Sequence, residues 1–345
     1  MRDTLQKEYW EAPAAADKYR QAYADGIEAF LSEMNRTAEA RRRDAFCPEN
    51  QEENRALLRK MLGMELFDTP ASQDPVVEYA GETDLAHVYR ITLYITGQIP
   101  FYALLMLPQG VTTPCPLIIA QHGGGGTPEL CSDLYGKNNY NHMVRRCLQR
   151  GAAVLAPQLL MWAQKEIETQ RAHPIPFDRT KTDAALKRFG SSITALEITG
   201  IQRCLDYVSA MPEIDENRIG MVGLSYGGYF TLHTMALDTR IKAGYSAGAF
   251  NSRDHHCFCD WGYPSSAFSL QDAEIAALCA PRKLYIQVGM EDTVFDYRTA
   301  VTEAQQAQDY FARLGAEDSF QFDLWPGGHT LSDHDSGFDF LFDAL

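Results

Sequence analysis

The segment that most constrains this chain is residues 218–229, in which Gly223-Leu-Ser225-Tyr-Gly227 sets a serine between two glycines. The apolar run before it, residues 219–222, is typical of a short buried strand, and residues 226–237 after it have the length and apolar content of a helix. A serine in so tight a strand-to-helix turn is forced outward, and a Cβ at either flanking glycine would collide with the neighbouring element. The pattern therefore predicts a nucleophile elbow within a sheet that helices cover.

Short apolar runs alternate with helical patterns along the rest of the chain. The strand-like runs cover residues 117–121, 152–156, 219–222, 241–245, 284–288 and 320–324, and helical patterns between them include residues 140–149, 196–211 and 298–314. Buried parallel strands that alternate with helices predict an α/β fold with a mostly parallel, doubly wound sheet. The alternation over residues 88–96, the turn at Thr96-Gly97-Gln98 and the run 101–107 add an antiparallel hairpin at its edge.

Residues 1–70 have the character of a helical extension, separate from a main domain over residues 71–345. Residues 51–62 form one expected helix, with Asn50 as its N-cap and Gly63 as its stop. The extension either packs on the main domain or contacts a second subunit, so a homo-oligomer stays an open alternative. An earlier helix has apolar residues at spacings of three and four on one face, namely Tyr19, Tyr23, Ile27, Phe30, Leu31 and Met34.

Composition narrows the expected partners. The 345 residues carry a net charge of −15, which argues against nucleic acid or an anionic membrane as a partner. No run approaches the roughly 18 apolar residues of a membrane span, and the N-terminus lacks the apolar core of a signal peptide. Most of the 8 cysteines lie in apolar segments, which is typical of reduced, buried thiols. The expected location is therefore the cytoplasm.

A serine hydroxyl is a weak nucleophile unless a histidine takes its proton and a carboxylate orients that histidine. After a nucleophile elbow the chain order is Ser, then Asp or Glu, then His. Asp292 follows the predicted strand 284–288 and is the preferred acid, with Glu291 and Asp296 as its alternatives. The carboxylate thus lies at the same end of the sheet as the serine.

The histidine that completes this order is His329, on the glycine-rich loop Trp325-Pro-Gly-Gly-His329 directly after the predicted strand 320–324. His334 is the weaker candidate because it begins the C-terminal helical pattern. The carboxyl ends of parallel strands meet at one edge of a sheet, so a shared site is expected there. The sequence therefore predicts a triad of Ser225, Asp292 and His329.

A glycine-rich loop comes after the predicted strand 117–121 and reads Gln121-His122-Gly123-Gly124-Gly125-Gly126. Consecutive glycines let backbone N–H groups converge on one point without obstruction from side chains. The N–H groups of Gly123 and Gly124, with that of Tyr226 after the nucleophile, are the expected oxyanion hole. The ring of His122 is expected to be structural, since the motif uses only its backbone.

A second match to the same serine pattern occurs at Gly244-Tyr-Ser246-Ala-Gly248 and also lies after a predicted strand. The next residues, Ala-Phe-Asn-Ser-Arg-Asp-His-His, are polar and have no helical period. An elbow needs a helix behind it to close the turn and to direct the positive end of its dipole at the oxyanion. Ser225 is therefore preferred over Ser246.

Two other segments attract notice without a defined chemistry. His255-His256-Cys257-Phe-Cys259-Asp260 resembles a metal cluster, but the chain has no second ligand pair at zinc spacing, so neither a metal nor an organic cofactor is expected. Residues 159–192 interrupt the strand–helix rhythm after a strand end. They are expected to be a cap or lid over the substrate pocket, with Trp162 and His173 as candidate pocket residues, or else a plain surface insertion.

With these motifs in place, residues 76–345 resemble the α/β-hydrolase superfamily, and within it most resemble the bacterial acetyl xylan esterase and dienelactone hydrolase-related group. The similar features are the segment Arg218-Ile-Gly-Met-Val-Gly-Leu-Ser-Tyr-Gly-Gly, the later Ala280-Pro-Arg282, and Gly289-x-x-Asp292. The helical extension that ends in Leu-Arg-Lys-Met-Leu-Gly63 is also similar to that group.

The resemblance implies hydrolysis of small-molecule esters, among them acylated sugars, through an acyl-enzyme formed by Ser225, Asp292 and His329. One departure concerns the substrate: where relatives often have an aspartate after Ala-Pro, this chain has Ala156-Pro157-Gln158. Two alternatives remain, a serine peptidase resembling the prolyl oligopeptidase group and a catalytically silent scaffold. The short stretch before the predicted strand 117–121 argues against the first, and the complete triad order argues against the second.

Overall fold

The structure is a computed structural model that describes residues 16–97, 99–112, 114–134, 138–161 and 177–345. The chain forms two compact units, residues 1–46 with 267–269, and residues 47–266 with 270–345. The described part of the first unit is α2 (Asp17–Ala45) and the end of α9 (Ser266–Ser269). In it the Arg42 guanidinium donates to the carbonyl of Ala267 over 2.5 Å. The early helix expected from the sequence is thus present.

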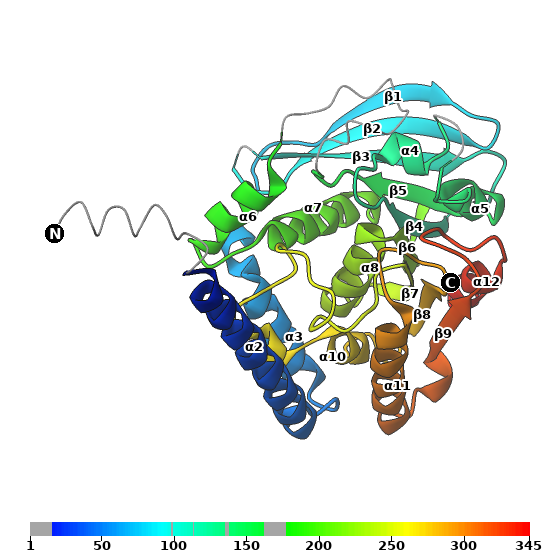
Figure 1. The fold of residues 1–345 in the computed structure, drawn as a ribbon. Helices are drawn as coiled ribbons and strands as arrows, with labels where there is room; N and C mark the ends of the chain where they lie inside the picture. Colours follow the sequence, from blue (N-terminus) through cyan, green and yellow to red (C-terminus); the bar gives the residue numbers. More distant parts are fainter. Residues whose placement is uncertain (1–15, 98, 113, 135–137, 162–176) are drawn as a thin grey trace. The chain divides into compact units, whose positions relative to one another are not determined.

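The second unit is built on one large sheet (Figure 1). The strand order is β1-β2-β3-β5-β4-β6-β7-β8-β9. The pairs β1–β2, β2–β3 and β3–β5 are antiparallel. From β5 onward in this order, through β4 to β9, every neighbouring pair is parallel. The strands of the described chain are β1 (Val76–Glu82), β2 (Ala86–Tyr94), β3 (Pro100–Pro108), β4 (Cys115–Gln121), β5 (Ala153–Pro157), β6 (Ile214–Leu224), β7 (Ile241–Ala247), β8 (Lys283–Gly289) and β9 (Phe320–Trp325).

Helices cover both faces of this sheet, as its apolar strands require (Figure 1). Helices α7, α8, α10 and α11 lie on one side, while α5 and α12 lie on the other. The helices of this unit are α3 (Gln51–Leu62), α4 (Pro128–Cys131), α5 (Met143–Gln149), α6 (Arg179–Lys187), α7 (Ile193–Val208), α8 (Tyr226–Leu237), α10 (Asp272–Ala277), α11 (Tyr297–Arg313) and α12 (Ser336–Phe342), with 3-10 turns η2 (Met64–Phe67) and η3 (Glu317–Ser319).

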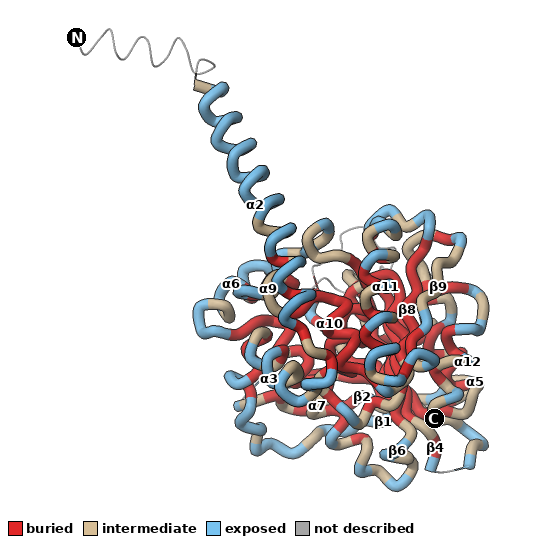
Figure 2. The backbone as a smooth tube through the Cα atoms, turned by 90° about the horizontal axis from the view of Figure 1, so that it is seen from below, coloured by how far each residue is buried: buried red, intermediate tan, exposed pale blue. Residues whose placement is uncertain are grey.

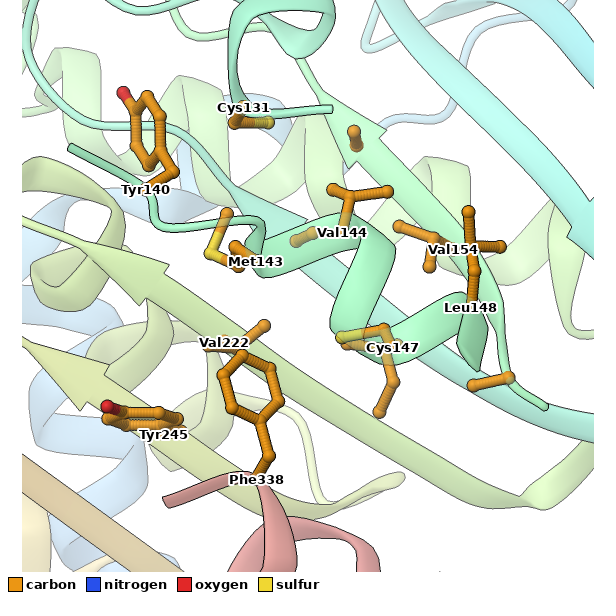
Figure 3. Packing of buried hydrophobic residues seen from close by; sticks show 14 of the residues in the cluster. Cys131, Tyr140, Met143, Val144, Cys147, Leu148, Val154, Val222, Tyr245 and Phe338 are labelled. Atoms are coloured by element: carbon orange, nitrogen blue, oxygen red, sulfur yellow. The ribbon is translucent and has the colours of Figure 1, made fainter. Parts of the chain in front are cut away.

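The core lies along the central strands, where Figure 2 shows the buried residues concentrated. Strand side chains alternate between the two faces, so Ile118 and Ala120 of β4 join the cluster beneath α5 and α12. There they meet Val144 and Cys147 of α5 and Phe338 of α12 (Figure 3). All 8 cysteines are unpaired, and five of them are buried, at positions 115, 131, 147, 204 and 279.

The sequence-based expectations for this unit are largely confirmed. The mostly parallel sheet is present, and β2 and β3 form the expected antiparallel hairpin. Gly63 ends α3 in a left-handed conformation with φ 76°, but the side chain of Asn50 makes no capping hydrogen bond. The first strand, β1, was not anticipated; most of its residues are exposed, so it lacks the apolar alternation that reveals a half-buried strand. No described helix is long and apolar enough to cross a membrane.

The topology itself points to the location of a site. From β4 the chain goes to its neighbour β5, and then returns across β4 to β6 on the other side. The connections therefore leave β4 and β6 in opposite directions, which opens a crevice at the carboxyl ends of these two strands. Those ends carry Gln121 and Leu224, directly before the glycine-rich loop and the serine.

Candidate active site

Ser225 occupies a strained turn between β6 and α8. It is one of the few non-glycine residues with positive φ, at φ 60° and ψ −123°. A Cβ on Gly223 would lie 2.3 Å from the carbonyl oxygen of Gly227, and a Cβ on Gly227 would lie 2.1 Å from that of Gln121. These glycines let the strand, the helix and the end of β4 approach one another. The local geometry is that of a nucleophile elbow.

His329 and Asp292 are joined by a hydrogen bond of 2.8 Å between Nδ1 and Oδ2. The second oxygen of Asp292 accepts the backbone N–H groups of Val294 and Phe295 at 2.7 and 3.0 Å. Burial raises the pKa of Asp292, but the hydrogen bond and charge of His329 and the two N–H groups outweigh it and hold that pKa below its ordinary value. The carboxylate is therefore ionised and fixed in orientation.

The rival acids and the rival histidine lie elsewhere. Asp296 caps α11 by accepting the N–H of Arg298 at 2.9 Å, and Glu291 is exposed. The Nε2 atom of His334 lies 3.2 Å from the Oδ2 atom of Asp323. The structure therefore brings together the preferred pair, and neither alternative carboxylate is hydrogen-bonded to His329.

A cavity of about 360 Å³ brings the predicted residues to one place. Ser225, His329, Tyr226, Gly123 and Gly124 all line it. None of its lining residues, which all belong to the described chain, is Asp, Glu, Lys or Arg. The remaining lining residues are Gly126, Leu130, Asn139, Tyr140, Leu224, Phe258 and Val294.

The glycine-rich loop after β4 forms a tight turn in which Gly126 N–H donates to the carbonyl of Gly123 at 3.1 Å. The N–H of Gly123 donates to the hydroxyl of Tyr140 at 2.8 Å. His122 is fully buried; its Nδ1 lies 2.9 Å from the carbonyl of Gly123, and its Nε2 accepts the N–H of Leu159 at 2.9 Å. Burial lowers the pKa of His122 to about 4, so the ring is neutral and structural, as expected.

Ser246, the serine of the second motif, is 1% exposed, and its hydroxyl donates to the carbonyl of Gly228 at 2.9 Å. Residues 248–265 after β7 form bends and turns, so the absence of a helix behind this serine is confirmed for this described stretch. Ser246 does not line the cavity. It supports the packing of α8 on β7.

A buried ion network beside the elbow could not be recognised from the sequence. Arg179 pairs with Glu197 at 2.8 Å and with Asp260 at 2.6 Å, and all three side chains are at most 5% exposed. The other oxygen of Asp260 accepts the hydroxyl of Tyr226 at 2.9 Å. The network therefore anchors the residue directly after Ser225. Its members are far apart in sequence and match no motif, so only the fold reveals them.

The remaining candidates have simpler outcomes. Trp162 and His173, the candidate pocket residues, lie outside the described residues. The ring of His256 packs on that of Phe295 at 4.3 Å, so this part of the histidine- and cysteine-rich segment belongs to an aromatic cluster. In the part of the chain that the structure describes, no group of three or more His, Cys, Asp or Glu side chains could hold a metal ion.

Fold and site together define a member of the α/β-hydrolase superfamily, with a serine elbow after a central parallel strand. More narrowly, the sequence profile of the dienelactone hydrolase family matches residues 102–327, which is more than half of the chain. The chain belongs to this family of hydrolases.

Individual relatives are more distant. YtaP of Bacillus subtilis (strain 168), whose name assigns it only to the hydrolases, is 25% identical over 291 residues, covering 80% of this chain and 94% of that protein. A Bacteroides fragilis NCTC 9343 structure described as an acetyl xylan esterase has a TM-score of 0.64 at 16% identity, over 81% of this chain and 77% of its own. A glucuronoyl esterase from Solibacter usitatus has a TM-score of 0.61 at 17% identity, over 85% of this chain and 91% of its own. These two likenesses show the fold.

Proposed function

We propose that the protein is a serine ester hydrolase that works through an acyl-enzyme, with Ser225 as nucleophile, His329 as general base and Asp292 as its orienting acid. The observation that carries the proposal is the 2.8 Å hydrogen bond between His329 and Asp292, beside a cavity that His329 and Ser225 both line. Family membership and the strained elbow support it independently.

The reaction depends on the tautomer that this hydrogen bond selects. Because Asp292 is ionised and accepts from Nδ1, the neutral ring of His329 keeps its lone pair on Nε2. That nitrogen takes the proton of Ser225 as the serine oxygen attacks the ester carbonyl, and later gives the proton to the departing alcohol. Water then hydrolyses the acyl-serine with the same base. The N–H of Tyr226 at the start of α8 is one donor to the oxyanion.

The cavity favours a short, uncharged acyl group. Its volume of about 360 Å³ lies near the lower end of the range for small-molecule sites. Besides His329, the described residues that line it offer glycines, amide and hydroxyl groups and a few apolar side chains, and none of them is Lys or Arg, which could pair with an acid. The structural relatives include a protein described as an acetyl xylan esterase. Acetyl esters of sugars or of other small alcohols are therefore the proposed substrates.

The test combines a covalent probe with a substrate panel. A fluorophosphonate probe should label the wild-type protein and should not label Ser225→Ala. Labelling that persists in that variant, or a wild-type protein that is not labelled, contradicts the serine mechanism. In a panel of acetylated sugars, longer acyl esters, methyl esters of sugar acids and peptide amides, the acetyl esters should give the highest kcat/KM. A preference for peptide amides would instead favour the peptidase alternative.

A further inference from the structure

The glycine-rich loop holds a hydroxyl group where only backbone donors were expected. The N–H of Gly123, one of the expected oxyanion donors, already donates to the hydroxyl of Tyr140 at 2.8 Å. This phenol oxygen therefore acts as acceptor in that bond and keeps its own proton for donation. No described residue accepts that proton. Gly123 thus orients a side-chain donor.

The Tyr140 hydroxyl lies beside the nucleophile. A Cβ placed on Gly123 would be 3.0 Å from the Cβ of Ser225 and 3.6 Å from the Tyr140 hydroxyl oxygen, so both groups surround the same point. A Cβ on Gly126 would be only 2.3 Å from this oxygen. Tyr140 also lines the cavity together with Ser225 and His329. The missing side chain of Gly126 therefore leaves room for this hydroxyl.

The Tyr140 side chain is held in place. The residue is 3% exposed, and its ring belongs to the core cluster next to Met143 and Val144, from which its hydroxyl points away (Figure 3). Its N–H donates to the side chain of Asn138 at 2.9 Å. The preceding carbonyl, that of Asn139, accepts the N–H of Leu331 at 3.0 Å, which ties this segment to the loop after β9. A donor fixed in this way needs no reorganisation during the reaction.

The Tyr140 hydroxyl also stays protonated. Burial raises the pKa of Tyr140 well above its ordinary value. Its proton is therefore available for hydrogen bonding at neutral pH.

From this geometry we infer that Tyr140 is a catalytic residue whose hydroxyl donates a hydrogen bond to the oxyanion formed when Ser225 attacks the ester carbonyl. The inference rests on the proposed ester hydrolysis and assigns one oxyanion donor to a side chain. The proton remains on the phenol oxygen throughout, and the bond strengthens as negative charge develops on the carbonyl oxygen. Tyr140 should therefore act on kcat more than on KM.

The decisive variant is Tyr140→Phe, which keeps the buried ring and removes only the hydroxyl. Its kcat on the best acetyl ester should fall by about 10²- to 10³-fold, with KM nearly unchanged. A trifluoromethyl ketone, which forms a tetrahedral adduct with an active serine, should lose affinity by a similar factor. The matched control is Tyr285→Phe, which removes a hydroxyl from another buried tyrosine of the same core cluster that does not line the cavity. This control should keep both values.

The outcomes separate this inference from the proposed function. If the wild-type protein hydrolyses esters and Ser225→Ala does not, but Tyr140→Phe keeps its kcat and its ketone affinity within about threefold, Tyr140 is not an oxyanion donor although the hydrolase proposal stands. If kcat falls while ketone affinity is unchanged, the hydroxyl acts elsewhere and the inference is overturned. If the wild-type protein hydrolyses no ester in the panel and the probe labels nothing, the proposed function itself fails.

Discussion

The ends of β6 and β7 carry the same five-residue serine pattern, but the two serines have opposite surroundings: Ser225 lines the cavity, whereas Ser246 is buried. The two strands are parallel neighbours, with Gly223 paired to Ser246 in register. At the end of β6 the serine, Ser225, leaves the strand at φ 60° and lines the cavity. At the end of β7 the serine is still inside its strand, is 1% exposed and donates its hydroxyl to a carbonyl of α8.

The difference shows that the residues directly after the motif decide its role. Helix α8 begins directly after Ser225, so the chain must reverse direction over one residue and the side chain is driven outward. Residues 249–265, directly after the second motif, form turns and irregular chain, so its serine can remain in the pleat of the sheet. The second motif then helps to hold the first, because its serine anchors Gly228 of α8.

The strongest test of this comparison is to remove the hydroxyl of Ser225 and that of Ser246 in separate variants. Ser225→Ala should lower kcat for ester hydrolysis by on the order of 10⁴-fold or more, because no nucleophile remains. Ser246→Ala should keep kcat within a few-fold and cost about 1 kcal/mol of stability through the lost hydrogen bond. Steady-state kinetics and urea unfolding of both variants measure this. Equal losses of activity would refute the different roles assigned to the two serines.

The same contrast extends to the carboxylates after β8. Asp292→Asn should reduce kcat by about 10³- to 10⁴-fold, because an amide can hold His329 in the wrong tautomer. Asp296→Asn makes the same chemical change at the N-cap of α11, where asparagine caps almost as well, so kcat and stability should change little. The pair is compared by kcat and thermal unfolding. A larger loss of kcat in Asp296→Asn would reassign the acid.

A third comparison is between two histidines: His122, which is buried after β4, and His329, which lies after β9. Burial lowers the pKa of His122 to about 4, whereas an unfolded histidine titrates near 6.5. The unfolded chain therefore binds one more proton between these values, and the free energy of unfolding falls by about 3 kcal/mol as pH drops from about 6.5 to about 4. The same sign holds for His233, whose burial lowers its pKa to about 3.

Urea unfolding at several pH values between 4 and 6.5 isolates the part due to His122. His122→Gln should reduce the slope of unfolding free energy against pH by about one proton. His329→Gln removes a histidine that is partly exposed and hydrogen-bonded to Asp292, and serves as the comparison. An unchanged slope in His122→Gln would mean that the buried ring is protonated in the native protein.

The smallest expected effect concerns the first glycine of each motif. The Cβ of Gly223→Ala would lie 2.3 Å from the backbone carbonyl of Gly227, whereas that of Gly244→Ala would lie 2.6 Å from the sulfur of Met235, which can move. Gly223→Ala should therefore destabilise the protein by about 1–3 kcal/mol, and Gly244→Ala by less. Chemical denaturation compares them. An equal loss of stability in the two variants would show that the backbone of the elbow can move to accommodate a Cβ.

Most of the sheet could be predicted because its central strands are short, apolar and separated by helical patterns. The parallel strands β4 to β9 and the β2–β3 hairpin were anticipated in this way. Strand β1 was not, since most of its residues are exposed and its pattern carries no core signal. The chain order of Ser225, Asp292 and His329 was readable because each lies after a strand with a recognisable turn.

Tyr140 and the Arg179–Glu197–Asp260 network could not be predicted. Tyr140 precedes α5 in a segment without a motif, and it approaches the glycine loop only because the core holds its ring. Arg179, Glu197 and Asp260 come from α6, α7 and a loop more than 50 residues further along the chain. Contacts of this kind depend on how elements pack, and no local pattern records them.

The sequence by itself determined the fold class and singled out Ser225, Asp292 and His329 as the proposed triad, because hydrophobic period and turn chemistry are local properties. It also rejected Ser246, since the missing helix is visible in the residues after it. The tertiary structure decided which carboxylate is bonded to His329, and that the N–H of Gly123 is already bonded to a phenol beside Ser225. These depend on distances between segments that are remote in the chain, which only packing sets.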